Sequence, residues 1–176
     1  MLDVGTGDCA LPSLLRTCGF VVAAIDNVRD YWPKGMVNRH WHVRNESIVQ
    51  PNGSHSYDAV TCISVLEHIA DPIAAMFGLH QRTAPGGTLI LTTPFGTEGH
   101  PNVYTAPGSS SSHLPYICRQ SCSADLDAWL RVGFSLEHAE YWRLFTSPIW
   151  SVGELVRPAQ RTPGPANLGC FVLRRH

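Results

Sequence analysis

Short apolar segments alternate with helix-like segments over residues 1–95, and this alternation restricts the chain to few folds. Residues 20–25 are six apolar residues in a row, as expected of a strand that is buried on both faces. Strands of this kind belong to parallel sheets, whose crossover connections place helices on both sides. We therefore predict an α/β fold, a three-layer sandwich around a doubly wound sheet.

The individual elements are predicted from apolar runs, β-branched residues and helix start and stop signals. The expected strands are residues 2–4, 20–25, 41–44, 57–64, 88–93, 134–141 and 169–173. The expected helices are residues 10–18, 73–80 and 124–132, and Asp71-Pro72 begins the second of them. Residues 94–120 and 146–167 are rich in Gly, Pro or Ser and are predicted as long loops, a type of segment that often binds ligands.

Length and composition exclude several classes of protein. With 176 residues, the chain is predicted to form one domain, residues 1–176. Its composition, 44% hydrophobic and 15% charged residues, excludes intrinsic disorder. A formal net charge of −1 with scattered arginines predicts no nucleic-acid partner. No apolar run is long enough for a membrane span. The six cysteines lack the spacing of a zinc site, so we predict that the protein binds no metal. We also predict that their thiols are reduced and that the protein is cytoplasmic.

Two glycines stand where the first strand turns into the first helix. Gly5 and Gly7 leave room for a ligand to approach the backbone, and Asp26 ends the second strand, where a carboxylate can accept hydrogen bonds from ribose hydroxyls. The same spacing also satisfies the dinucleotide-binding pattern. Asp3 and Asp8 would oppose a pyrophosphate at the helix N-terminus, so the residues favour a cofactor with a cationic amino group and a sulfonium.

Three segments resemble one known family in order and spacing. Residues 3–7 (DVGTG) resemble motif I of the class I S-adenosylmethionine-dependent methyltransferases. Residues 57–69 (YDAVTCISVLEHI) resemble the fourth strand and the following turn of the branch written FDxVxxxxVLEHI. Residues 85–89 (PGGTL) resemble the turn into the fifth strand. The resemblance covers residues 1–95, and beyond them it is only architectural.

This resemblance implies a Rossmann-like, seven-stranded sheet of order 3-2-1-4-5-7-6. Residues 1–95 would form the cofactor-binding half, and residues 96–176 the acceptor-side half with its long loops. The cofactor would be S-adenosylmethionine and the product S-adenosylhomocysteine. The implied cofactor-binding residues are Asp3, Gly5, Thr6, Gly7, Asp26, Asn27, Glu46, Ser47 and Ser64. Asp26 would take the ribose, Glu46 and Ser47 would meet the adenine, and Ser64 would line the reacting methyl group.

Methyl transfer from a sulfonium is an in-line displacement, to which positioning and water exclusion can contribute most. For a hydroxyl acceptor, His68 after the fourth strand is the best-placed base, with a packing role as the alternative. Glu67-His68 also resembles a metal-binding pair of small-RNA 2′-O-methyltransferases, but Ser64 replaces a further acid, so we predict no metal. Candidates for contact with the acceptor are Tyr104, Tyr116, Trp142, Phe145, Trp150, His100 and His113.

The sequence thus predicts methyl transfer to an O, N or C nucleophile of a small molecule. Two alternatives stay open: a non-catalytic or truncated binding module with the same fold, and an NAD(P)-binding oxidoreductase. The chain begins on the first predicted strand, whereas relatives carry helices upstream that cover part of the sheet. We therefore expect an uncovered apolar face and a homodimer formed through it.

Overall fold

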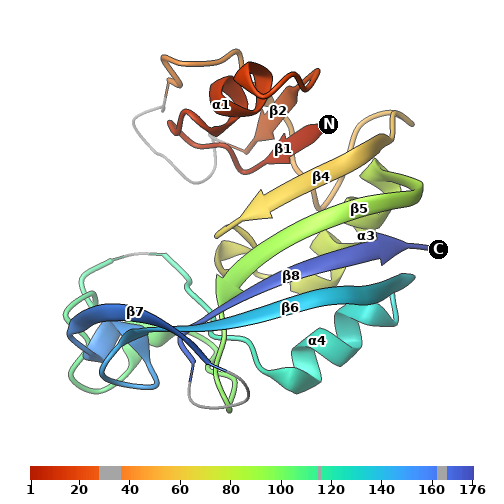
Figure 1. Ribbon diagram of the computed structural model, residues 1–176. Helices are drawn as coiled ribbons and strands as arrows, with labels where there is room; N and C mark the ends of the chain where they lie inside the picture. The colour runs from red at the N-terminus through yellow and green to blue at the C-terminus, as the bar shows by residue number, and fades with distance from the viewer. Residues whose placement is uncertain (28–36, 115, 162–165) are drawn as a thin grey trace.

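The computed structural model describes residues 1–27, 37–114, 116–161 and 166–176. The strands in these residues form one sheet of order β3-β2-β1-β4-β5-β8-β6-β7 (Figure 1). They are β1 Leu2–Val4, β2 Ala23–Asp26, β3 Arg44–Asn45, β4 Tyr57–Ile63, β5 Thr83–Pro94, β6 Phe134–Phe145, β7 Leu155–Arg161 and β8 Leu168–Arg175. The α-helices are α1 Leu11–Thr17, α3 Pro72–Arg82 and α4 Ser123–Leu130, and the 3₁₀ turns are η1 Leu66–His68, η2 Val103–Thr105 and η3 Trp150–Val152.

The strand order confirms the predicted Rossmann-like sheet. Strands β3, β2, β1, β4 and β5 run parallel, and β8 lies antiparallel between β5 and β6. The structure adds β7, an eighth strand, in a segment that was predicted as a loop. Pro158 lies within β7 and argues against a central strand, but β7 is at the edge of the sheet, where a missing N–H is tolerated.

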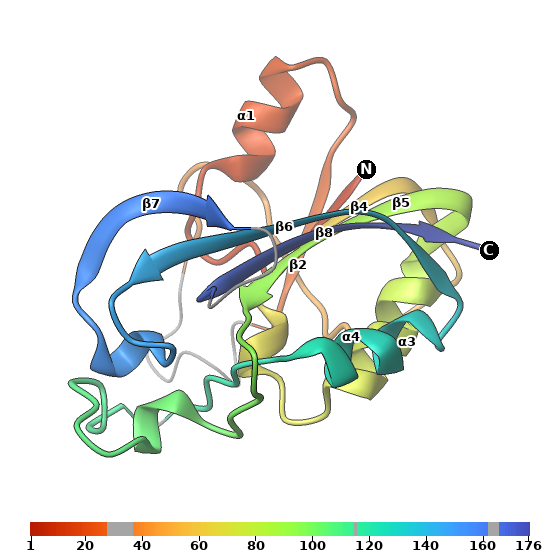
Figure 2. The ribbon, with the colours of Figure 1, turned by 60° about the horizontal axis from the view of Figure 1, so that its bottom comes forward.

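Helices cover the sheet on both sides, as predicted. Figure 2 shows α3 and α4 on one face and α1 on the other, over the end that carries β2. The main core lies under α3 and α4, where Leu89 and Leu91 of β5 are fully buried together with Met76 and Leu79 of α3. With 11 residues, α3 is the longest described helix, and no described helix reaches the length and apolarity of a membrane span.

Several predicted elements have other bounds in the structure: the strand expected at residues 41–44 is Arg44–Asn45, and those expected at 88–93 and 134–141 extend to Thr83–Pro94 and Phe134–Phe145. The apolar run at residues 20–25 becomes a strand only from Ala23, because Ala23 pairs with Leu2 at the start of the short strand β1. Phe20 and Val21 are therefore 50% and 89% exposed rather than buried in a sheet. Helix α3 begins as predicted, since Asp71 accepts a hydrogen bond from the backbone N–H of Ala74 at 2.9 Å, but it continues to Arg82.

The segments predicted as long loops fold together into what we call the loop lobe, the described residues of 95–121 and 146–154. Backbone bridges connect His100 with Gln120, and Ser151 donates its hydroxyl to the carbonyl of Val103 at 2.5 Å. Tyr104 and Trp150 meet edge to face with ring centroids 5.7 Å apart. The loop lobe therefore has a small core of its own beside the end of β5.

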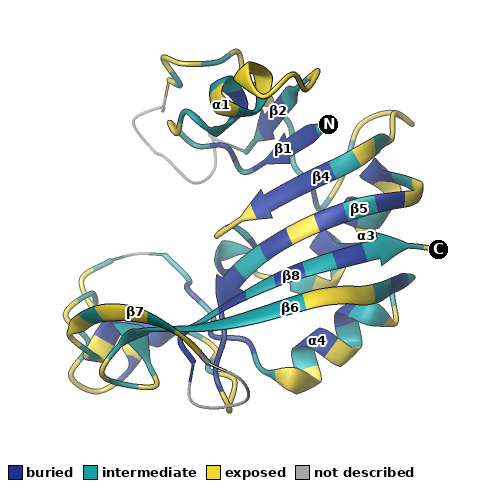
Figure 3. Cartoon of the chain, in the orientation of Figure 1, coloured by how far each residue is buried: buried dark blue, intermediate teal, exposed yellow. Residues whose placement is uncertain are grey.

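The face of the sheet opposite α3 and α4 is partly apolar. Ile63 of β4 and Ile90 of β5 are each 37% exposed on that face, and Figure 3 shows the alternation of buried and exposed residues along β5. Thr92 and the β8 residue Cys170, which pair in register beside them, are more polar. Self-association through this face stays a prediction.

Candidate functional site

The turn after β1 requires glycine at its first position. Gly5 has a φ of 74° and Gly7 a φ of 56°, both in the left-handed region. A Cβ atom on Gly5 would lie 2.2 Å from Cγ2 of Val65, which is closer than any real contact. The N–H of Gly5 donates to the carbonyl of Ile25 at 2.9 Å. The turn is thus held between β2 and the segment after β4.

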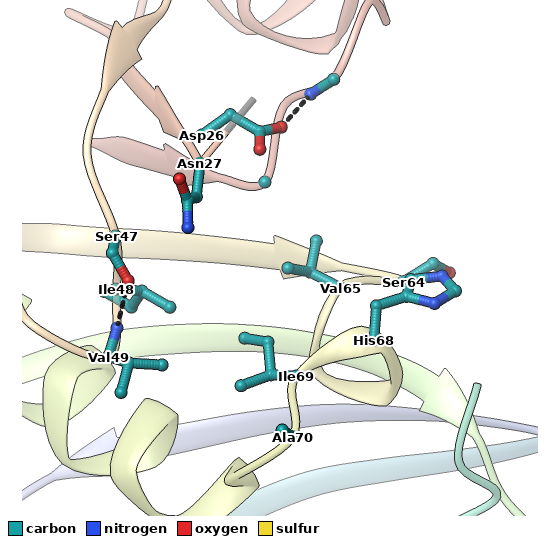
Figure 4. Close-up of a pocket in the computed structure, with 12 residues that line it drawn as sticks. Asp26, Asn27, Ser47, Ile48, Val49, Ser64, Val65, His68, Ile69 and Ala70 are labelled. Atoms are coloured by element: carbon teal, nitrogen blue, oxygen red, sulfur yellow. Dashed lines mark hydrogen bonds between the residues drawn. The ribbon is translucent and has the colours of Figure 1, made fainter. Parts of the chain in front are cut away.

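Asp26 holds the other end of this turn. Its Oδ2 atom accepts a hydrogen bond of 2.6 Å from the backbone N–H of Gly7 (Figure 4). Burial raises the pKa of Asp26 above its ordinary value, against the opposite effect of the N–H groups of Gly7 and Asn27. The fold therefore places Asp26 in direct contact with the glycine turn that was predicted beside it.

Asp3 supports the turn from within the sheet. It is only 2% exposed and accepts hydrogen bonds from the hydroxyls of Thr6 at 2.8 Å and Thr61 at 2.6 Å. Burial raises the pKa of Asp3, while these two hydroxyls act in the opposite direction. Asp3 and Thr6 therefore lie behind the turn, and neither lines a cavity described below.

A cavity of about 530 Å³, the first cavity, opens where β1, β2, β3 and β4 end. This is the crevice at the carboxyl ends of the strands where open α/β sheets bind ligands, and its volume is typical of small-molecule sites. Its lining residues are Gly5, Gly7, Asp26, Asn27, Ser47, Ile48, Val49, Ser64, Val65, His68, Ile69 and Ala70 (Figure 4). Six of the nine predicted cofactor-binding residues and the predicted base are among them.

Glu46 forms an ion pair inside the fold and does not line the first cavity. Its carboxylate forms an ion pair with the buried guanidinium of Arg82 at the end of α3, and it lies 3.8 Å from Arg44. It also accepts a hydrogen bond of 3.2 Å from the N–H of Asn52. Glu46 is absent from the cavity wall, and its neighbour Ser47 lies there.

Ser64, the residue after β4, has a strained backbone conformation. Its φ of 54° makes it the one described residue other than glycine with a positive φ. Its N–H donates to Thr92 on β5, at 3.1 Å to the carbonyl and 3.0 Å to the hydroxyl. A strained residue that its neighbours hold in place is typical of functional sites. The turn directs the following residues, Val65 to Ala70, along the cavity.

The apolar wall of this cavity was not predicted residue by residue. Val65 and Ile69 belong to the VLEHI segment, so the motif itself carried the signal that could have found them. Ile48 and Val49 follow the short strand β3, and no motif in the sequence marked them.

His68 lies on the wall of the first cavity and is held by the loop lobe. Its Nδ1 atom is 2.7 Å from the carbonyl oxygen of Ile117. Because a carbonyl can only accept, Nδ1 carries the proton, and Nε2 is the nitrogen able to accept one. Burial lowers the pKa of His68 from its ordinary value, against the opposite effect of the Ile117 carbonyl, and this favours the neutral ring.

A second cavity of about 190 Å³ shares Ser64 and His68 with the first. Its other lining residues come from the segment after β4, the ends of the C-terminal strands and the loop lobe: Glu67, Pro94, Tyr104, Cys118, Leu144, Phe145, Trp150, Asn167 and Leu168. Of the predicted acceptor-side residues, Tyr104, Phe145 and Trp150 line it. Tyr116, Trp142, His100 and His113 are absent from both walls.

Comparison with known proteins agrees with this geometry. A family model described as a methyltransferase domain matches residues 1–144. The chain belongs to the methyltransferase-domain family. This assignment confirms the resemblance seen in the sequence and leaves the NAD(P)-binding alternative without support.

Among curated members of this family, the ubiquinone biosynthesis O-methyltransferase of Xanthomonas campestris is 33% identical over 100 residues, covering 53% of this chain and 42% of that protein. The tRNA U34 carboxymethyltransferase of Sulfurimonas denitrificans is 35% identical over 80 residues, covering 45% of this chain and 27% of that protein. The chain thus spans less than half the length of either methyltransferase.

Solved methyltransferase structures share the fold. A SAM-dependent methyltransferase from Methanosarcina mazei superposes with a TM-score of 0.67 at 14% identity, covering 99% of this chain and 91% of that one. The magnesium protoporphyrin IX methyltransferase of Synechocystis, solved with bound SAH, gives a TM-score of 0.60 at 18% identity, covering 99% and 73%. At such identities the likeness extends to the fold alone.

Proposed function

We propose that the protein binds S-adenosylmethionine in the first cavity and directs its methyl group to a nucleophile of a small molecule in the second. The observation that carries this proposal is that Ser64 and His68 belong to both walls. A donor and an acceptor seated in the two cavities would meet at these residues, as an in-line displacement requires.

The residues of the first cavity fit such a cofactor. The turn at Gly5 and Gly7 leaves no side chain where the methionine end would lie, and Asp26 is placed to accept hydrogen bonds from ribose hydroxyls. Ser47, Ile48 and Val49 offer a mostly apolar surface for the adenine. Asp3 and Thr6 act indirectly by holding the turn, and Glu46 acts by fixing the segment that leads to Ser47.

The protein's own contribution to the chemistry is positioning and proton acceptance. S-adenosylmethionine supplies the methyl group when bound. Ser64 fixes the direction of the chain between the two cavities, and the loop lobe excludes water from the acceptor. For a hydroxyl acceptor, His68 takes the proton at Nε2, because Nδ1 already donates to Ile117.

The acceptor is part of the proposal only as a class, a small molecule with an O, N or C nucleophile. The names of the ubiquinone biosynthesis O-methyltransferase and the tRNA U34 carboxymethyltransferase indicate different acceptors, so we argue the acceptor class from the second cavity. A cytoplasmic location belongs to the same proposal. All six cysteines lie in the described residues and none of them forms a disulfide.

Calorimetric titration of the protein with S-adenosylhomocysteine, and separately with NAD, tests the cofactor assignment. We expect saturable binding of S-adenosylhomocysteine at one site and no heat with NAD. A chain that binds NAD and ignores S-adenosylhomocysteine would overturn the proposal. Release of S-adenosylhomocysteine from S-adenosylmethionine in the presence of an acceptor panel then separates an enzyme from a binding module.

A further inference from the structure

Glu67 is a buried carboxyl group on the wall of the second cavity. The residue is 4% exposed, and its Oε2 atom has no hydrogen-bond partner among the described residues. None of the ion pairs among those residues includes Glu67. Native proteins satisfy most buried polar atoms, so an unsatisfied carboxyl group on a residue that lines a cavity points to a hydrogen-bond partner that enters the cavity.

The surroundings of Glu67 keep its carboxyl neutral near pH 7. Burial raises its pKa to about 8, against smaller opposite effects from its own backbone N–H and the hydroxyl of Thr93. A protonated carboxyl group has one O–H donor in addition to its acceptor oxygens. Glu67 can therefore donate a hydrogen bond to an oxygen atom of a ligand.

Apart from the Arg119 guanidinium, the titratable groups beside Glu67 are uncharged in the same range. Burial raises the pKa of Tyr104 to about 12 and that of Cys118 to about 11, and it raises that of Cys62 on β4. Arg119 donates its backbone N–H to the carbonyl of Glu67 at 2.9 Å and its guanidinium to that of Ala70 at 2.9 Å. With His68 neutral as well, the second cavity offers a ligand no charged wall group near pH 7.

The size and walls of the cavity suit a single aromatic ring. A dry apolar cavity of about 150 Å³ is known to hold benzene, so 190 Å³ holds one ring with a small substituent. Trp150 lies between Tyr104 and Phe145, with ring centroids 5.7 and 5.8 Å away. Rings so arranged present both edges and faces to an aromatic ligand.

We infer that the second cavity takes an uncharged, single-ring aromatic compound with an oxygen substituent, and that the Glu67 carboxyl group donates a hydrogen bond to that oxygen. The inference rests on the proposed function, since it identifies this ring as the class of methyl acceptor. Glu67 then selects for an oxygen acceptor and against an anionic one, because the wall of the second cavity offers an anion no cationic group.

Ligand-observed NMR titration with benzyl alcohol at pH 6.5 tests the binding directly and needs no turnover. We compare the unaltered protein with Glu67→Gln, which keeps a neutral donor, and Glu67→Leu, which has none. Glu67→Gln should bind within about threefold of the unaltered protein, and Glu67→Leu at least about tenfold more weakly. Equal binding by Glu67→Leu, or benzoate binding as tight as that of benzyl alcohol, would overturn the inference.

A pH series on the unaltered protein covers the case in which Glu67→Leu does not fold. Benzyl alcohol does not ionise between pH 6.5 and 9.5, so a loss of affinity over this range reports on the protein. If only the neutral carboxyl binds, the loss at pH 9.5 should be about 30-fold and should be absent in Glu67→Gln. A flat profile in the unaltered protein would refute the role of Glu67.

S-adenosylhomocysteine titration of the same samples separates this inference from the proposed function. Binding of S-adenosylhomocysteine without binding of benzyl alcohol refutes the acceptor class and leaves the methyltransferase proposal standing. Binding of benzyl alcohol without S-adenosylhomocysteine refutes the proposed function instead.

Discussion

Replacing Gly5 by alanine forces a methyl group into the side chain of Val65. The new Cβ would lie 2.2 Å from Cγ2 and 2.6 Å from Cγ1 of Val65. Rotation of Val65 gives little relief, because both branches are in the way and a β-branched side chain has few alternative rotamers. The backbone of the turn or of the segment after Ser64 must therefore shift, and both of them line the first cavity.

Two costs add in Gly5→Ala. A side chain at a φ of 74° costs about 1–2 kcal/mol, and overpacking costs about 1–3 kcal/mol. The free energy of unfolding, measured by urea denaturation, should fall by about 2–5 kcal/mol in total. Gly53→Ala is the matched control, since Gly53 has a φ of 83° and no atom within 4 Å of a new Cβ, so it should lose only the first of the two costs.

A double-mutant cycle with Val65→Ala isolates the clash. Removal of the Val65 branches should restore about 1–3 kcal/mol to Gly5→Ala, which would appear as a coupling energy between the two positions. If Gly5→Ala is no more destabilising than Gly53→Ala, or if the two substitutions are additive, then Val65 does not pack against the turn and the reasoning fails.

Further predictions concern binding, pH dependence, catalysis and assembly. Asp26→Ala should weaken S-adenosylhomocysteine binding in calorimetry by about 2–3 kcal/mol, the scale of lost charge-assisted hydrogen bonds, whereas Asp127→Ala on the exposed side of α4 should not change it. Because the folded pKa of Glu67 is raised to about 8 from 4.5, its stabilising effect is complete below pH 4.5 and is lost as the pH rises through 8. Urea midpoints should therefore fall across this range, and Glu67→Gln should flatten the slope. With a hydroxyl acceptor, His68→Ala should lower kcat by about 10²–10⁴ while S-adenosylhomocysteine affinity stays within about threefold; an unchanged kcat would exclude His68 as the base. Sedimentation velocity should show a dimer that Ile90→Glu weakens, and a monomer at all concentrations would contradict association through the open face.

Local sequence signals identified the glycine turn and the acid at the end of β2. The glycine turn and the position of Asp26 depend on short spacings around the ends of β1 and β2, which can be recognised in a sequence, whereas the strand order was implied by the family resemblance. The position of Glu46 could not be predicted from local spacing. Its ion-pair partner Arg82 is 36 residues away along the chain, and only the docking of α3 brings the two together.

The acceptor side depends on contacts that no spacing reveals. Tyr104 and Trp150 pack against each other across 46 residues, and residues 94–120 show no helix or strand period because their order comes from this packing. Strand β7 was not predicted for a different reason. Its Pro158 is compatible with a strand only at the edge of a sheet, and the sequence does not show which strands lie at the edge. Both differences arise from tertiary context that overrides local sequence preference.

Asn167, just before β8, ties the end of β6 to the segment that follows it. Its side-chain oxygen accepts hydrogen bonds from the N–H groups of Leu144 and Phe145 at 3.0 and 2.8 Å, and its amide group donates to the carbonyls of Ser147 and Pro148 at 2.6 and 3.2 Å. One amide thus anchors the chain as it leaves β6 for the loop lobe. Sequence changes in the lobe beyond this anchor can reshape the acceptor wall while the glycine turn stays as it is. The fold therefore separates a loop wall that can vary from a glycine turn whose conformation Val65 and Asp26 constrain.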